Sequence, residues 1–157
     1  MSKLRVAIIG TGMIANSAHF PALNILREEG LVDVVGVADI REEIAAETAK
    51  RHHVPNYYKD PQKMLDELKP DFVAVCTPNV YHKEWTIKAL QAGAHVACEK
   101  PIATSYADAK EMWDTAKQCG KMLFPCQCMR WRNYMQRSKE LISTGELGDI
   151  YFSDVSF

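Results

Sequence analysis

Val6-Ala7-Ile8-Ile9-Gly10-Thr11-Gly12-Met13-Ile14-Ala15 is the stretch that decides the fold of this 157-residue chain. Its four leading apolar residues predict a short buried strand, and the residues from Met13 onward can continue as a helix. A G-x-G-x-x-A pattern between a strand and a helix is typical of a turn that binds the pyrophosphate of a dinucleotide. Gly10 permits the tight turn, Gly12 lets the backbone approach the pyrophosphate, and Ala15 allows close packing of helix on strand. The alternative is a tight turn that binds no ligand.

Strand and helix patterns alternate along the rest of the chain. Candidate strands are rich in Val, Ile, Phe or Cys without strict alternation, as expected for strands covered on both faces; they are 5–9, 32–38, 71–76, 95–98 and 122–127, with a weaker one at 57–58. Because parallel crossovers are right-handed, this alternation predicts an α/β fold. We expect a doubly wound parallel sheet of the NAD(P)-binding Rossmann type, with strand order 3-2-1-4-5-6 and a ligand at the carboxyl ends of the strands.

Capping and breaking residues mark the helix boundaries. Ser105-x-x-Asp108 is a capping box that starts a helix ending at Gly120. Pro21 predicts a break at His19-Phe20, followed by a new helix with the proline in its first turn. The pair His52-His53 is predicted to be a solvated helix end.

The C-terminal stretch does not fit this sheet. We expect residues 1–128 to form the Rossmann domain, and residues 129–157 to form a connecting helix and the first strand of a truncated substrate domain. The helix is expected at 132–143 and the strand at 149–157. Because a lone strand has nothing to pair with, we expect the chain to be the front part of a longer protein. The unpaired strand is expected either to be disordered or to pair with another copy in a homo-oligomer.

The composition is that of an ordinary globular domain and excludes several classes of protein. The chain is 47% hydrophobic and 25% charged, with a net charge of −1. Both signs of charge are scattered, so there is no basic stripe for nucleic acid and no polybasic membrane anchor. The amino terminus lacks the apolar stretch of a signal peptide, and no apolar run is long enough to span a membrane. We therefore expect a cytoplasmic protein that binds neither nucleic acid nor membrane.

The five cysteines are expected to be reduced thiols, because their number is odd and they lack paired C-x-x-C spacing. Cys126-x-Cys128, with Cys119 nearby, is a candidate metal cluster. No histidine follows it at ligand spacing, so we predict no metal site.

A carboxylate follows the second predicted strand. Asp39 is placed where it can accept hydrogen bonds from both hydroxyls of an adenine ribose and would repel a 2′-phosphate, which favours NAD over NADP. Arg41, two residues later, can compensate a phosphate charge, which leaves NADP possible. Asp39 can also cap the helix that begins near Glu42, alone or in addition to binding the ribose.

A loop follows the fourth predicted strand at the same edge of the sheet. Thr77-Pro78-Asn79 lies at the crevice where ribose and nicotinamide would bind, and its polar side chains can donate and accept hydrogen bonds there. In the alternative interpretation, Asn79 only caps the following helix. His82, at the start of that helix, is expected either to contact the cofactor or to serve as a cap or surface residue.

Glu99-Lys100-Pro101 follows the fifth predicted strand. Pro101 favours an extended conformation for Lys100, so that the lysine ammonium can point into the crevice. Beside a substrate hydroxyl that loses its proton, this cation would stabilise the developing negative charge. Without the glycine turn upstream, a lysine at a strand end is usually a solvated charge.

These motifs, in this order and spacing, resemble the Gfo/Idh/MocA oxidoreductase family, which includes inositol dehydrogenases and glucose-fructose oxidoreductase. The segments that carry the resemblance are Gly10–Ala15, Cys76–Asn79 with His82, Ala92–Val96 and Glu99–Pro101, and the likeness continues through Arg130-Trp131 and Gly145–Ile150. The resemblance implies an NAD-dependent enzyme acting on a sugar or polyol. It implies that Lys100 is the catalytic lysine, that Glu99 lines the nicotinamide end, and that Arg130 and Trp131 lie near the cofactor or substrate.

The resemblance has one departure and one gap. Asn133 stands where many members of the family have proline, which concerns only the local loop. The family's second domain, with its substrate pocket and usually an acid/base histidine, lies beyond this chain. A different class of function, a non-catalytic nucleotide-sensing or binding module, can use the same fold. Lys100 favours the enzyme, because a sensor needs no cation beside a reacting hydroxyl, and a Gly-rich methyltransferase is disfavoured by Asp39 and by the lysine motif.

Overall fold

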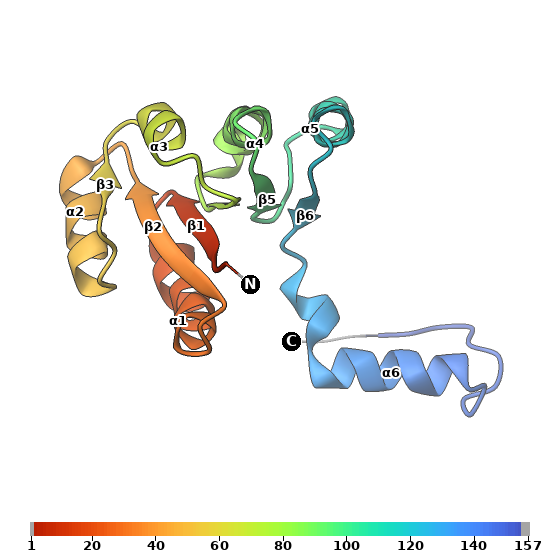
Figure 1. Ribbon diagram of the computed structural model, residues 1–157. Coiled ribbons are helices and arrows are strands. Elements are labelled where there is room, and N and C mark those ends of the chain that lie inside the picture. The colour runs from red at the N-terminus through yellow and green to blue at the C-terminus, as the bar shows by residue number, and fades with distance from the viewer. Residues whose placement is uncertain (1, 155–157) are drawn as a thin grey trace. The chain divides into compact units, whose positions relative to one another are not determined.

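The chain forms two compact units in a computed structural model that describes residues 2–154 (Figure 1). The first unit ends at Cys126, and the second begins at Gln127. The first unit contains the sheet and the helices that cover it, so it contains most of the predicted site.

Within the described residues, six parallel strands form one sheet in the order β3-β2-β1-β4-β5-β6, which confirms the predicted topology. The strands are β1 (Leu4–Ile9), β2 (Val32–Ala38), β3 (Tyr57–Tyr58), β4 (Phe72–Val75), β5 (His95–Cys98) and β6 (Leu123–Pro125). β1 pairs with both β2 and β4, so the chain order reverses at β1. Ligands of doubly wound sheets bind at such a switch point, outside the carboxyl ends of the strands.

Helices cover both faces of this sheet (Figure 1). One face packs against α1 (Phe20–Glu28) and α2 (Glu42–Arg51), and the other against α3 (Pro61–Leu68), α4 (His82–Gln91) and α5 (Tyr106–Cys119). Alternate residues of each strand enter the two cores: Ile8 belongs to the α1 side and Ile9 to the α3–α5 side. This double burial is the reason why the strand sequences are apolar without alternation.

The predicted caps of α5 are present. The Ser105 hydroxyl accepts a hydrogen bond from the Asp108 N–H at 3.1 Å. Gly120 ends the helix in the left-handed conformation, at φ +63°.

The break predicted at His19-Phe20 does not occur. Instead, η1 (Ala15–His19) has π-helical hydrogen bonding and runs directly into α1. As predicted, Pro21 lies in the first turn of α1, which here is the transition from π-helical to α-helical hydrogen bonding.

The prediction that His52-His53 is a solvated helix end is wrong for His52. Its ring stacks on the ring of Phe20, with centroids 3.7 Å apart and an interplanar angle of 3°. Phe20 is fully buried, so this contact ties the end of α2 to the start of α1. His53 is exposed as predicted.

The second unit contains η3 (Cys128–Trp131) and α6 (Asn133–Ser143), and α6 buries none of its side chains. The strand predicted over 149–157 is not formed in its described part, residues 149–154. A single strand with no partner cannot satisfy its backbone hydrogen bonds in a ladder. Residues 155–157 of that prediction lie outside the described residues. That residues 129–157 begin a second domain stays a prediction.

The glycine turn at the end of β1 yields a stability prediction. Gly10 has φ +88°, and a Cβ built on it would lie 2.7 Å from the carbonyl carbon of Cys76, which is backbone and cannot move aside. Gly10→Ala is therefore expected to lower the free energy of unfolding by about 1–3 kcal/mol. Gly12→Ala is the matched control, because a Cβ at Gly12 meets no atom within 4 Å. Urea unfolding of both variants measures the difference, and equal stabilities would contradict this account of the turn.

Candidate dinucleotide-binding site

The glycine turn connects β1 to η1 at the switch point of the sheet. The Gly10 N–H donates to the Ala38 carbonyl at 2.8 Å, which ties the turn to the end of β2. Because the backbone of Cys76 and Thr77, just past the end of β4, lies against Gly10, only glycine fits there. Gly12 by contrast borders open space on its Cβ side. A bare backbone turn with open space beside it, at the amino end of a helix, fits a bound pyrophosphate.

Asp39 holds this turn from the end of β2. One carboxylate oxygen accepts hydrogen bonds from the Thr11 N–H at 3.0 Å and the Thr11 hydroxyl at 3.1 Å. The other accepts from the Arg41 N–H at 3.0 Å and from Arg41 Nε at 3.3 Å. Burial by itself would raise the pKa of Asp39, but these hydrogen bonds outweigh it and hold the pKa below its ordinary value of 3.8. Asp39 therefore braces the glycine turn as an ionised carboxylate, a role that sequence reasoning missed.

Several of the predicted cofactor residues line one cavity of about 440 Å³. They are Gly10, Asp39, Arg41, Thr77 and Pro78. The Thr77 hydroxyl is buried and has no hydrogen-bond partner among the described residues, which suits a polar ligand. Sequence reasoning missed a second group of lining residues from the start of α4, which consists of Tyr81, Glu84 and Trp85. Their helical spacing, one turn apart next to the Thr77 loop, was the available signal.

His82 connects the loops that follow β4 and β5. Its Nε2 lies 2.8 Å from the Thr77 carbonyl oxygen, and its Nδ1 lies 2.9 Å from the Pro101 carbonyl oxygen. The residue is only 1% exposed. His82 thus holds the Lys100-Pro101 segment against the Thr77 loop, and its predicted contact with the cofactor stays a prediction. Asn79 is exposed, and the residue at the N-cap of α4 is Tyr81.

Glu99 and His19 meet beside the Lys100 loop, although they are far apart in sequence. His19 Nε2 lies 2.9 Å from Glu99 Oε1, and Glu99 Oε2 accepts a hydrogen bond from the Lys100 N–H at 3.1 Å. The Lys100 residue itself is exposed. The His19–Glu99 pair was not predicted, because only the packing of η1 over the strand ends brings His19 to Glu99.

Cys126 contributes a third possible ligand atom to this pair. The potential metal-ligand atoms of His19, Glu99 and Cys126 all lie within 4.8 Å of one another. This group differs from the cysteine cluster that the sequence analysis considered and rejected, and the prediction of no metal stays a prediction. Burial, together with the nearby charge of Glu99, raises the pKa of the Cys76 thiol well above 9.0, so that this thiol is protonated at neutral pH.

The remaining predicted residues are placed as follows. Met13 is exposed, and Ile14 packs against the core on the α1 side, where Ala15 is buried. Arg130 and Trp131 lie on η3 of the second unit, and their role at the cofactor stays a prediction.

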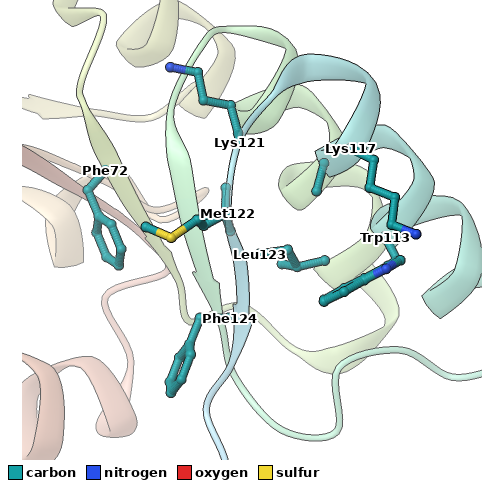
Figure 2. A pocket seen from close by; sticks show the side chains of 9 residues that line it. Phe72, Trp113, Lys117, Lys121, Met122, Leu123 and Phe124 are labelled. Atoms are coloured by element: carbon teal, nitrogen blue, oxygen red, sulfur yellow. The ribbon is translucent and has the colours of Figure 1, made fainter.

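A larger cavity of about 540 Å³ contains none of the predicted residues (Figure 2). It lies beside β6 at the edge of the sheet. Met122 and Phe124 point toward Phe72 on one side of β6, and Leu123 points toward Trp113 on the other (Figure 2). Its lining is mainly apolar, and the two lysines among the lining residues, Lys117 and Lys121, direct their ammonium groups away from Met122, Leu123 and Phe124 (Figure 2). We therefore assign the candidate site to the smaller cavity, because its lining residues are better suited to a dinucleotide, although the other cavity has the larger volume.

The sequence matches the model of the Gfo/Idh/MocA family, described as an oxidoreductase family with an NAD-binding Rossmann fold, over residues 4–126. A D-glucoside 3-dehydrogenase of Escherichia coli K12 is 41% identical over 150 residues, which are 96% of this chain and 42% of that protein. A myo-inositol 2-dehydrogenase of Thermotoga maritima is 29% identical over 145 residues, which are 92% of this chain and 42% of that protein. The chain thus spans about two fifths of the length of these relatives.

Solved structures show the same fold. The WlbA dehydrogenase of Chromobacterium violaceum, in complex with NADH and UDP-GlcNAcA, superposes with a TM-score of 0.89 at 30% identity. The superposition covers 96% of this chain and 43% of that one. Among the helices of residues 2–154, none has the length and apolar character needed to cross a membrane.

The bracing role of Asp39 predicts how stability depends on pH. Because its folded-state pKa lies below the unfolded value, the carboxylate contributes stability above the unfolded pKa, and this contribution is lost as the pH falls through the folded pKa. At neutral pH, Asp39→Asn is expected to lower the free energy of unfolding by about 1.5–3 kcal/mol, as for the loss of hydrogen bonds to a charged group. The difference from the wild type should shrink as the pH falls below 3.8.

Urea unfolding across the acid range measures this difference. Asp66→Asn is the control, because Asp66 is exposed on α3. A deficit of Asp39→Asn that stays constant with pH would contradict the assignment of an ionised brace.

Proposed function

Because this chain belongs to the Gfo/Idh/MocA family of oxidoreductases with an NAD-binding Rossmann fold, we propose that the whole protein is an NAD-dependent dehydrogenase that oxidises a hydroxyl group of a sugar or polyol. The observation that carries the proposal is the meeting of three loops at the carboxyl edge of the sheet. The glycine turn, the Thr77 loop and the Lys100 loop follow the neighbouring strands β1, β4 and β5. The loops that would bind the cofactor and the loop that carries Lys100 therefore lie at the same edge of the sheet.

In this proposal, the described residues hold the cofactor as follows. The N–H groups of Gly12 and Met13 bind the pyrophosphate at the positive end of the helix that follows, whereas those of Gly10 and Thr11 already donate to Ala38 and Asp39. The cavity between Asp39, Arg41 and Trp85 receives the adenosine. The free hydroxyl of Thr77 then gains a partner. Glu99 and Asn79 line the path toward the nicotinamide.

Lys100 acts on the substrate oxygen. When bound, the nicotinamide would supply the acceptor for the hydride, the hydrogen with its electron pair, that leaves the substrate carbon. The Lys100 ammonium stabilises the negative charge that develops on the hydroxyl oxygen as its proton departs. Through Pro101, His82 keeps this lysine at a defined distance from the Thr77 loop. The relatives named as dehydrogenases of glucosides and inositol support a polyhydroxylated substrate.

The remainder of the relatives' length has no counterpart in this chain. We propose that in the whole protein this remainder supplies the substrate pocket and an acid/base histidine, as the family resemblance implies. A homo-oligomer and a cytoplasmic location belong to the same proposal. A nucleotide-sensing module of the same fold is the alternative that the catalytic experiment below tests.

Cofactor preference provides the first test. The Asp39 carboxylate disfavours a 2′-phosphate, so NADH is expected to bind more tightly than NADPH. Arg41 is the residue able to bind the 2′-phosphate of NADPH, because its side chain is 58% exposed and contacts Asp39 only through Nε. Arg41→Ala should weaken NADPH binding about 10-fold, as for the loss of a charge-assisted contact, and leave NADH nearly unchanged.

Calorimetric titration of both cofactors measures these affinities. Arg51→Ala is the control, since Arg51 is an exposed arginine at the opposite end of α2, whose N-cap is Arg41, and pairs with Glu47. Equal or tighter binding of NADPH by the wild type would overturn the preference for NAD.

Lys100→Ala provides the second test, in the whole protein. The turnover number with sugars and inositols should fall by roughly 10²- to 10⁴-fold, because the ammonium acts on the transition state. The dissociation constant of NADH should hardly change. Lys110→Ala, an exposed lysine on α5, is the control. The 157-residue chain by itself should bind NADH without turnover. If Lys100→Ala leaves turnover unchanged, or the wild type binds NADH without oxidising any polyol, the dehydrogenase proposal fails.

A further inference from the structure

Asn16 clamps the glycine turn from the side opposite to the expected pyrophosphate. Its side-chain amide nitrogen donates to the Thr11 carbonyl at 2.8 Å and to the Gly12 carbonyl at 2.9 Å. These carbonyls belong to the peptide units whose N–H groups are those of Gly12 and Met13. In a planar trans peptide the C=O and N–H bonds point in opposite directions. Holding the two carbonyls therefore aims the two N–H groups away from Asn16, toward the side where an anion binds.

His52 in turn fixes the orientation of the Asn16 amide. Its Nε2 lies 2.9 Å from Asn16 Oδ1. Since the amide nitrogen donates both of its hydrogens to carbonyls, Oδ1 is the acceptor, and His52 Nε2 carries the hydrogen. With this tautomer the amide cannot flip without losing all three hydrogen bonds.

The ring of His52 is itself held in place. It stacks on Phe20 at a centroid distance of 3.7 Å, and Arg27 of α1 donates to the His52 backbone carbonyl at 2.8 Å. Burial, followed by electrostatic repulsion chiefly from Arg51 and Arg27, lowers the pKa of His52 below its ordinary value of 6.5. The ring is consequently neutral at neutral pH, as a single Nε2–H donor requires.

We infer that His52 is a positioning residue for the cofactor, which acts through Asn16 on the two peptide units that face the pyrophosphate. The inference rests on the proposed NAD site. It gives the carboxyl end of α2 a role in binding, although no predicted cofactor residue lies there. The contact pre-organises the turn, so that its N–H groups are aimed before the cofactor arrives and less ordering accompanies binding.

Three variants of the whole protein distinguish the effect of the His52–Asn16 hydrogen bond on cofactor binding from the effect of ring stacking on Phe20. His52→Phe keeps an aromatic ring on Phe20 but removes the donor. It should raise the dissociation constant of NADH about 3- to 10-fold, as for one neutral hydrogen bond. His52→Gln restores a donor near the position of Nε2 and should recover part of this loss. Lys50→Ala, an exposed residue on the same helix, should have no effect.

A double-mutant cycle tests whether His52 acts through Asn16. Asn16→Ala should weaken NADH binding at least as much as His52→Phe, and adding His52→Phe to Asn16→Ala should cause no further loss. ADP should lose affinity by the same factor as NADH, because the affected contact is to the pyrophosphate. The turnover number at saturating NAD should be unchanged, since Lys100 lies on another loop.

The outcomes distinguish this inference from the proposed function. If the wild type binds NADH and His52→Phe binds it equally well, the positioning role is excluded while the cofactor site stands. Additive losses in the cycle, or a fall in turnover at saturating NAD, would also overturn it. If the wild type binds no NADH, the proposed function itself fails.

Discussion

The hydrogen bonds from Thr11 to the buried carboxylate of Asp39 are the interaction on which the rest of the site depends. A glycine turn is intrinsically flexible, because glycine loses more conformational freedom on folding than any other residue. Asp39 compensates by fixing the turn to the end of β2 through two hydrogen bonds to a charged group, which are stronger than neutral ones. The same carboxylate also holds Arg41. One anion thus fixes the turn and also contacts Arg41, the residue proposed above to affect the binding of NADPH.

The other loops are fixed by the sheet itself. The N–H of Cys76 donates to the Ile9 carbonyl, that of Glu99 to the Val75 carbonyl, and that of Cys126 to the Cys98 carbonyl. Each residue just past a strand is therefore paired with the last residue of its neighbour, and the strand ends form one continuous row. His82 and the His19–Glu99 pair link this row to α4 and η1. Polar contacts concentrated at one edge of the sheet, with apolar packing elsewhere, are typical of a fold that binds its ligand outside the carboxyl ends of the strands.

Family membership and local geometry answer different questions about this chain. The match over residues 4–126 assigns an NAD-binding Rossmann fold. In this particular sequence, Asn16 donates hydrogen bonds to the Thr11 and Gly12 carbonyls of the glycine turn, and His52 contacts the Asn16 amide. The turn motif defines which backbone groups face the phosphate, but many side chains can support it, and these supporting contacts are where one family member can differ from another.

The sequence by itself determined the strand order, the switch point and the loops that carry Asp39, Thr77 and Lys100, because hydrophobic periodicity and glycine spacing are local properties of the chain. Only the tertiary structure decided which side chains meet. The sequence predicts Asp39 as a ribose ligand, which stays a prediction; only the fold adds the hydrogen bonds from Thr11 and Arg41 to its two oxygens. His52 looked like a solvated helix end, yet the packing of α2 on α1 places its ring on Phe20. The break expected at His19-Phe20 does not occur, because the π-helical η1 runs directly into α1. Contacts between residues tens of positions apart depend on how the helices pack on the sheet. No local pattern along the chain predicts which of these residues meet.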